Sequence, residues 1–246
     1  MNDTINTLLN HRSIRKYNQK EIGNEELDYI LKAAQAAPNS INAQSVSIIV
    51  VKDKERKSKI AQLAGNQKYI EEAPVFLLFC MDFNRTNKAC GKVGLEQTIV
   101  HSQEANLVGG VDTGLAMGNA IAAAESLGLG TVCIGGIRKS PNEIIDLLSL
   151  PKYVFPLVGL VIGHGEEMPD QKPRLPKKVV VSQESYKEIS SDDLDEYDKL
   201  VSDYLKERTG GKDDATWSQR VAGIYQYVYF PEVKGALEKQ GFTSEK

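Results

Sequence analysis

The apolar positions of this chain follow two different spacings. Within residues 25–36 they recur at intervals of three and four, which predicts an amphipathic helix that ends before Pro38. Elsewhere, short continuous runs of β-branched and aromatic residues predict buried strands. These runs cover residues 45–51, 75–80, 131–134 and 155–162.

Further helices are predicted between these strands, over residues 54–63, 104–127 and 141–148. The last of them has Pro141 in its first turn directly after Ser140, a favourable pairing at a helix start. Strands separated by helices in this way predict an α+β sandwich, and no sequence repeat is evident.

The character of the sequence changes after Gly165. Prolines 169, 173 and 176 predict an extended crossing, and residues 190–207 form a strongly charged amphipathic pattern. We therefore expect a core over residues 1–165, and an extended crossing with a C-terminal helical excursion over residues 166–246. The aromatic residues between positions 217 and 235 would be costly to leave exposed, so we expect them to dock on this subunit or on a partner.

Glycine and alanine dominate the predicted helix over residues 104–127. Such small residues let backbones approach closely. The helix could be the central helix of one subunit's core, or it could also lie in a subunit interface, because the two kinds of surface have similar compositions. Asp112, Asn119 and Glu125 interrupt its apolar run, so we expect a buried helix and not a membrane span.

Composition narrows the choice of partners. The 246 residues carry a net charge of −3, which argues against a nucleic-acid-binding protein. Cys80, Cys90 and Cys133 are widely spaced and form no CxxC pair, so we expect neither a metal site nor a disulfide framework. The first ten residues lack the features of a secretory signal. We expect a cytoplasmic protein with small-molecule partners and no membrane partner.

Two basic segments are candidates for binding an anion. His11, Arg12, Ser13 and Arg15 lie within HRSIR, and an arginine offers a rigid fork that matches phosphate oxygens. The alternative is a solvated helix start. In the second segment, KPRLP, prolines hold the chain extended around Lys172 and Arg174, which favours a ligand site over a flexible charged linker without excluding the linker.

Three further segments could contact a flat ligand. In IGGIR, Ile134, Gly135 and Gly136 follow a predicted strand, and paired glycines permit close approach of the backbone, although an ordinary tight turn has the same pattern. No GxGxxG fingerprint is present, so a Rossmann nucleotide site is not indicated. The polar loop PNSINAQS, with Asn39 and Ser40, has side chains able to bond the edge of a heterocycle, although such loops are usually only connections. Gln67, in the segment GNQKYI, would by itself indicate no site.

In order and spacing these segments resemble the nitroreductase superfamily, in its branch of oxygen-insensitive NADPH nitroreductases and flavin reductase P. The similarity extends to the loop with Ser40 and Gln44, to AAESLGLG at 123–130 and to the ERT…TWS pattern at 207–218, and so covers nearly the whole chain. The resemblance implies a nitroreductase-like fold, with a central, mostly antiparallel sheet flanked by helices. It also implies an intertwined homodimer with a C-terminal helical excursion.

The resemblance further implies an FMN cofactor at the interface of the homodimer. His11, Ser13, Lys172 and Arg174 would surround its phosphate with support from Arg12, and Arg15 and Gln67 would face the pyrimidine side of the ring. Ile134, Gly135 and Gly136 would line the other edge, Asn39 and Ser40 would come from the second subunit, and Tyr69 belongs to the same set. None of these is expected to act as a catalytic nucleophile, since the cofactor carries the chemistry.

The implied activity is a ping-pong oxidation of NADPH, with NADH possible, and reduction of nitroaromatics, quinones, azo compounds or free flavin. Arg208 and Lys212 would select the 2′-phosphate of NADPH, whereas Asp213 and Asp214 would repel it if they lie within a Debye length of roughly 8 Å. Three alternatives stay open. They are another flavin chemistry on the same fold, a flavin-binding redox sensor or carrier with little turnover, and a structural dimer without flavin.

Overall fold

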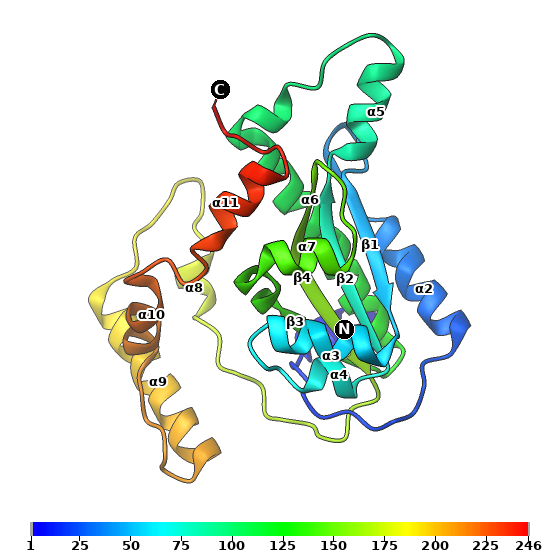
Figure 1. Cartoon of the computed structure of the whole chain (residues 1–246). Helices are drawn as coiled ribbons and strands as arrows, with labels where there is room; N and C mark the ends of the chain where they lie inside the picture. Colours follow the sequence, from blue (N-terminus) through cyan, green and yellow to red (C-terminus); the bar gives the residue numbers. More distant parts are fainter. Residues whose placement is uncertain (1, 246) are drawn as a thin grey trace. The chain divides into compact units, whose positions relative to one another are not determined.

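The computed structural model describes residues 2–245 and contains one four-stranded antiparallel sheet (Figure 1). The strands are β1 (Val46–Val51), β2 (Val75–Asp82), β3 (Gly130–Ile134) and β4 (Val154–Gly163), in the order β1-β2-β4-β3. All four coincide with the runs that the sequence predicted. The longer inner strands are almost wholly buried, which explains why their sequences are continuously apolar instead of alternating.

Helices cover both faces of this sheet. Successive β2 side chains point to opposite faces, so Leu77 and Phe79 join one core cluster while Phe76 and Leu78 join another. The first cluster lies under α2 (Asn24–Gln35) and α6 (Gln103–Ser126), and the second lies under α3 (Lys54–Leu63), α4 (Tyr69–Glu72) and α7 (Pro141–Leu147). The result is a three-layer α+β sandwich, as the sequence predicted.

Two sides of α6 have different environments. Ala116, Ala120 and Ala124 pack on the sheet, and a Cβ added at Gly109 would lie only 2.8 Å from the Met81 Cβ. The opposite side leaves Leu107 and Val111 more than 60% exposed. By length and composition α6 could cross a membrane, yet its alanine side forms part of the core. The sequence predicted a buried helix, and that holds for one side only, because this side alone meets the sheet.

The described chain divides into two compact units. Residues 2–169 and 230–245 form the first, and Asp170–Tyr229 form the second. The sequence placed a single boundary after residue 165, whereas the chain re-enters the first unit at Phe230. There α11 (Glu232–Lys239) and Phe242 close a third cluster, in which the Phe242 ring meets the Phe83 ring edge-on at 5.9 Å.

The remaining elements are short, apart from α9. The first unit also contains α1 (Asp3–Leu9), α5 (Asn84–Lys92) and 3₁₀ turns at Ser40–Asn42, Ile99–His101 and Gly135–Lys139. The second unit consists of α8 (Lys177–Val180), α9 (Ser191–Thr209) and α10 (Trp217–Tyr225) with their connections. Helix α9 confirms the charged amphipathic pattern, and Gly210 ends it in the left-handed conformation that suits glycine.

Candidate functional site

The segment with His11, Ser13 and Arg15 runs along the open edge of β3. Ser13 forms a parallel bridge with Thr131, and the Ile14 amide donates to the Thr131 carbonyl oxygen at 2.9 Å. Alternate side chains of extended backbone point to opposite sides. Ile14 is buried, and a Cβ at Gly130 would lie 2.8 Å from it. Ser13 and Arg15 therefore point away from Ile14 and, together with His11, form a row of polar residues along the edge of β3.

His11 is held by a carboxylate from α6. Its Nδ1 lies 2.6 Å from Glu125 Oε1, and the Thr131 hydroxyl donates to the same oxygen at 2.7 Å. Glu125 was not among the predicted site residues, although it lies in the AAESLGLG segment. Only the fold shows its position beside His11, because the two residues are 114 positions apart.

The segments GNQKY and IGGIR meet at the end of β3. A Cβ at Gly136 would lie 2.4 Å from the Ala64 carbonyl oxygen and 2.5 Å from Gln67 Nε2, so only glycine fits there without a shift. Gln67 Nε2 donates to the Ala64 oxygen at 2.6 Å, and the Tyr69 hydroxyl donates to Gln67 Oε1. The Gln67 amide is thus fixed beside the glycine pair.

Tyr17 interacts both with the segment that carries the row of polar side chains and with Tyr69, which bonds Gln67. Its hydroxyl donates to the Ile14 carbonyl oxygen at 2.6 Å. Burial raises the pKa of Tyr17 well above its ordinary value, the nearby charge of Arg15 lowers it in part, and Tyr69 raises it further. Arg15 and Tyr69 therefore both act on one buried phenol. The first unit thus gathers a guanidinium, an imidazole, a hydroxyl and an amide around β3.

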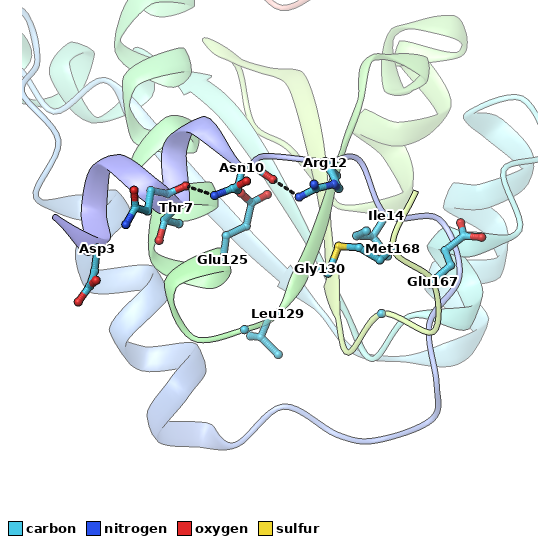
Figure 2. A pocket seen from close by; sticks show the side chains of 13 residues that line it. Asp3, Thr7, Asn10, Arg12, Ile14, Glu125, Leu129, Gly130, Glu167 and Met168 are labelled. Atoms are coloured by element: carbon cyan, nitrogen blue, oxygen red, sulfur yellow. Dashed lines mark hydrogen bonds between the residues drawn. The ribbon is translucent and has the colours of Figure 1, made fainter. Parts of the chain in front are cut away.

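Arg12 faces a different space. It lines a cavity of about 440 Å³ together with Asn10, Glu125 and the loop after β4 (Figure 2). Its Nη1 donates to the Asn10 carbonyl oxygen at 2.8 Å, while its Nε is buried without a hydrogen-bond partner among the described residues. Arg12 is the one predicted site residue that lines this cavity within residues 2–245.

Asn39 and Ser40 lie against α6. The Ser40 amide donates to Asp112 Oδ1 at 3.0 Å, and the Gln44 amide donates to Asn39 Oδ1 at 2.9 Å. Asp112 is buried, and its second carboxylate oxygen has no hydrogen-bond partner among residues 2–245. Asn39 lines a pocket whose described walls contain none of the residues of the row on β3.

The remaining predicted residues belong to the second unit. Lys172 and Arg174 flank Pro173, whose carbonyl oxygen accepts from the Tyr197 hydroxyl of α9 at 3.0 Å. This bond ties the extended KPRLP segment to the longest helix of the unit. At the other end of α9, Arg208 Nη1 donates to the Tyr204 hydroxyl at 3.1 Å, and its guanidinium lies over the Tyr204 ring.

The loop after α9 contains Asp213, whose negative charge is offset by a neighbouring arginine. The Ala215 amide donates to Asp213 Oδ1 at 3.1 Å, and Arg220 binds the other oxygen of this carboxylate. These two interactions hold the pKa of Asp213 below its ordinary value. The sequence treated Asp213 as a bare negative charge beside Arg208 and Lys212, whereas Arg220 offsets that charge locally.

Models of known families match almost the whole length of the chain. The nitroreductase family model matches residues 8–164, and the model of that family's C-terminal domain matches residues 172–245. The chain belongs to the nitroreductase family. The resemblance predicted from the sequence motifs is thereby confirmed.

Curated nitroreductase-family relatives span the full chain. The FMN reductase [NAD(P)H] of Bacillus subtilis is 51% identical over 100% of both chains. The NADPH-flavin oxidoreductase of Vibrio harveyi is 43% identical over 99% of both. The solved structure of NfrA2 from B. megaterium covers 100% of both chains with a TM-score of 0.98 and 49% identity. The predicted nitroreductase fold is therefore confirmed.

Proposed function

We propose that this chain is an FMN-dependent NAD(P)H oxidoreductase. The observation that carries the proposal is the row of His11, Ser13 and Arg15 beside β3, with Gln67 and the glycine pair at the end of the same strand. The relatives described as an FMN reductase [NAD(P)H] and an NADPH-flavin oxidoreductase support it. When bound, FMN accepts a hydride from the nicotinamide and passes the electrons to an acceptor.

The residues around β3 suit a ligand with a phosphate at one end and a polar ring at the other. In this proposal His11 and Ser13 bind the phosphate, with Lys172 and Arg174 as further cationic groups, while Arg12 lines the separate cavity beside Asn10. Arg15 and Gln67 bond the pyrimidine edge, where the fixed charge of Arg15 stabilises the negative charge of the reduced ring. Tyr69 holds the Gln67 amide in place, while Ile134, Gly135 and Gly136 line the opposite edge.

The acceptors in this proposal are flat molecules, including free flavin, nitroaromatics, quinones and azo compounds. They would bind in the same site after the oxidised nucleotide has left, so that reduction and oxidation of the flavin alternate. Arg208 and Lys212 favour NADPH through its 2′-phosphate. Because Arg220 compensates Asp213, the loop repels that phosphate less than its sequence suggests. NADH remains a substrate at lower affinity.

We further propose that the enzyme is a cytoplasmic homodimer that binds neither nucleic acid nor membranes. The exposed side of α6 supports the dimer, because a Cβ at Gly110, Gly114 or Gly118 would meet no atom within 4 Å beyond the helix's own neighbouring backbone. Tyr225 and Tyr229 stack on each other while 72% and 46% exposed, and offer further apolar area to a partner. In the dimer, Asn39 and Ser40 would reach the cofactor of the other subunit.

One anaerobic titration tests the activity. The purified protein, reconstituted with FMN, is mixed with NADPH and then with a quinone, while the flavin absorbance is followed. We expect the band to bleach with NADPH, to recover with the quinone and to do so over many cycles. A protein that cannot be reconstituted with FMN would overturn the proposal, and a protein that bleaches once without repeated turnover would be a carrier.

The same titration tests the nucleotide preference. NADPH should bleach the wild type faster than NADH does, and Arg208→Ala should slow bleaching by NADPH alone. Lys206→Ala, on the same turn of α9, is the matched control because it removes an equal charge. Equal rates with both nucleotides in the wild type would refute the preference.

A further inference from the structure

Glu125 occupies a constrained position at the end of α6. Its side chain is only 12% exposed, and Oε1 receives the Thr131 hydroxyl at 2.7 Å and lies 2.6 Å from His11 Nδ1. Thr131 is completely buried. The bond from Thr131 therefore fixes the Glu125 carboxylate against β3 independently of its contact with His11.

This contact determines which imidazole nitrogen is available to a ligand. An ionised carboxylate only accepts hydrogen bonds, so Nδ1 must carry the hydrogen shared with Glu125. Nε2 is then the nitrogen that can face a ligand, and in the doubly protonated ring it donates. Histidines that ligate metals are oriented in the same way, by a carboxylate that accepts from the nitrogen facing away from the ligand.

We propose that Glu125 is the positioning residue of the FMN phosphate site, and that it acts by holding His11 with Nε2 toward the phosphate. The inference rests on the proposed binding of FMN. Glu125 also carries a negative charge, which would repel a phosphate that it met directly. His11 stands between the two groups, so the carboxylate supports phosphate binding only while the imidazole is present.

This arrangement predicts that the effect of neutralising Glu125 changes sign with the residue at position 11. In the wild type, Glu125→Gln keeps an oxygen for Thr131 but loses the charged bond to His11. We expect FMN to bind roughly tenfold more weakly, as for a lost charge-assisted hydrogen bond. In a His11→Ala background, the same substitution removes an unshielded negative charge, and FMN should bind more tightly than to His11→Ala alone.

Fluorescence titrations with FMN and riboflavin measure these effects. Riboflavin lacks the phosphate, so its affinity should change by less than about twofold in Glu125→Gln. Glu104→Gln is the matched control, because it removes the same charge from the exposed first turn of α6. FMN should bind to this variant as it binds to the wild type. Equal losses for FMN and riboflavin, or no reversal of sign in the His11→Ala background, would overturn the proposal.

Nitrogen NMR of the cofactor-free protein provides a separate readout. The chain has three histidines, so ¹⁵N-labelled imidazoles give few resonances to assign. We expect protonated Nδ1 at His11 in the wild type and a mixture of tautomers in Glu125→Gln. An unprotonated Nδ1 in the wild type would overturn the proposal even if FMN binds. A wild type with protonated Nδ1 that does not bind FMN would instead overturn the proposed function and, with it, the role of Glu125.

Discussion

Gly136 is a position where the absence of a side chain allows two segments to meet. A Cβ there would lie 2.4 Å from the Ala64 carbonyl oxygen, whereas a Cβ at Gly135 would meet only the flexible end of Arg138 at 3.5 Å. Neither glycine has a positive φ that would strain an alanine. Substituting each of the two glycines in turn therefore distinguishes a steric effect at Gly136 from a general effect of substitution in this loop.

We expect Gly136→Ala to lower the free energy of unfolding by roughly 1–3 kcal/mol, because the added methyl group must displace backbone. It should also weaken FMN binding by moving Gln67. Gly135→Ala should change the free energy of unfolding by less than about 0.5 kcal/mol. Urea unfolding of the cofactor-free proteins measures both. Equal destabilisation by the two substitutions would contradict the steric explanation.

The second prediction at the scale of a residue concerns how Tyr17 makes the stability of the fold depend on pH. Burial raises its pKa in the folded protein, so the folded state keeps the phenolic proton at pH values where the unfolded chain has lost it. The stabilisation is complete below the unfolded pKa of about 10 and decreases above it, by up to about 1.4 kcal/mol per pH unit.

Tyr17→Phe removes both this pH dependence and the hydrogen bond to Ile14. At neutral pH the variant should be less stable by about 1 kcal/mol, and the difference from wild type should shrink as the pH rises above about 10. Burial also raises the pKa of the Cys80 thiol, but that contribution is common to both proteins and cancels. A constant difference from pH 8 to pH 11 would show that Tyr17 titrates normally.

At the scale of elements, the sequence predicted the central helices and strands closely. The run at residues 54–63 became α3 (Lys54–Leu63) without a shift, and the helix expected over 104–127 became α6 (Gln103–Ser126). Helix α5 (Asn84–Lys92) was not predicted, because it has no buried residue and its sequence lacks an apolar stripe facing the core. Periodicity reports burial, so it misses helices that pack little.

The prediction at the scale of elements concerns the role of helix α6 in the proposed dimer. A lysine at Val111 would place a charge in the middle of the exposed apolar side. If that side forms the dimer interface, Val111→Lys should give a monomer in sedimentation velocity, because a buried unpaired charge costs several kcal/mol. The monomer should also lose FMN affinity, since Asn39 and Ser40 are proposed to act across the interface.

The control for this experiment adds the same charge on another helix. Gln62 is exposed on α3, and Gln62→Lys should leave the oligomeric state unchanged. Circular dichroism of both variants shows that the helices are retained. A dimeric Val111→Lys protein would mean that α6 faces solvent, and the proposed dimer would need another surface.

For the whole molecule, the prediction concerns the coupling between FMN and folding. A ligand that binds only the folded state at a hundred times its Kd stabilises that state by about 2.7 kcal/mol. For a chain of this size, that corresponds to a rise in Tm of roughly 5–11 °C. Differential scanning fluorimetry with FMN measures the rise, and riboflavin at the same concentration should produce a smaller one. Equal shifts would argue against a phosphate site.

Local pattern alone determined much of this protein. The alternation of strands and helices, the charged α9 and the motifs of the nitroreductase family could all be predicted, because hydrophobic periodicity and short motifs are properties of neighbouring residues. The placement of Gln67 and the glycine pair in one site came from the family resemblance and remains a proposal, although the structure does place them in contact.

Only the tertiary structure decided which distant residues meet. Glu125 lies beside His11 because the pairing of the N-terminal segment with β3 brings it to the end of α6. The exposure of Leu107 and Val111 on one side of α6 likewise depends on which elements pack against that helix. Contacts of this kind depend on strand register and on the packing of whole elements, and no local pattern in the chain encodes them.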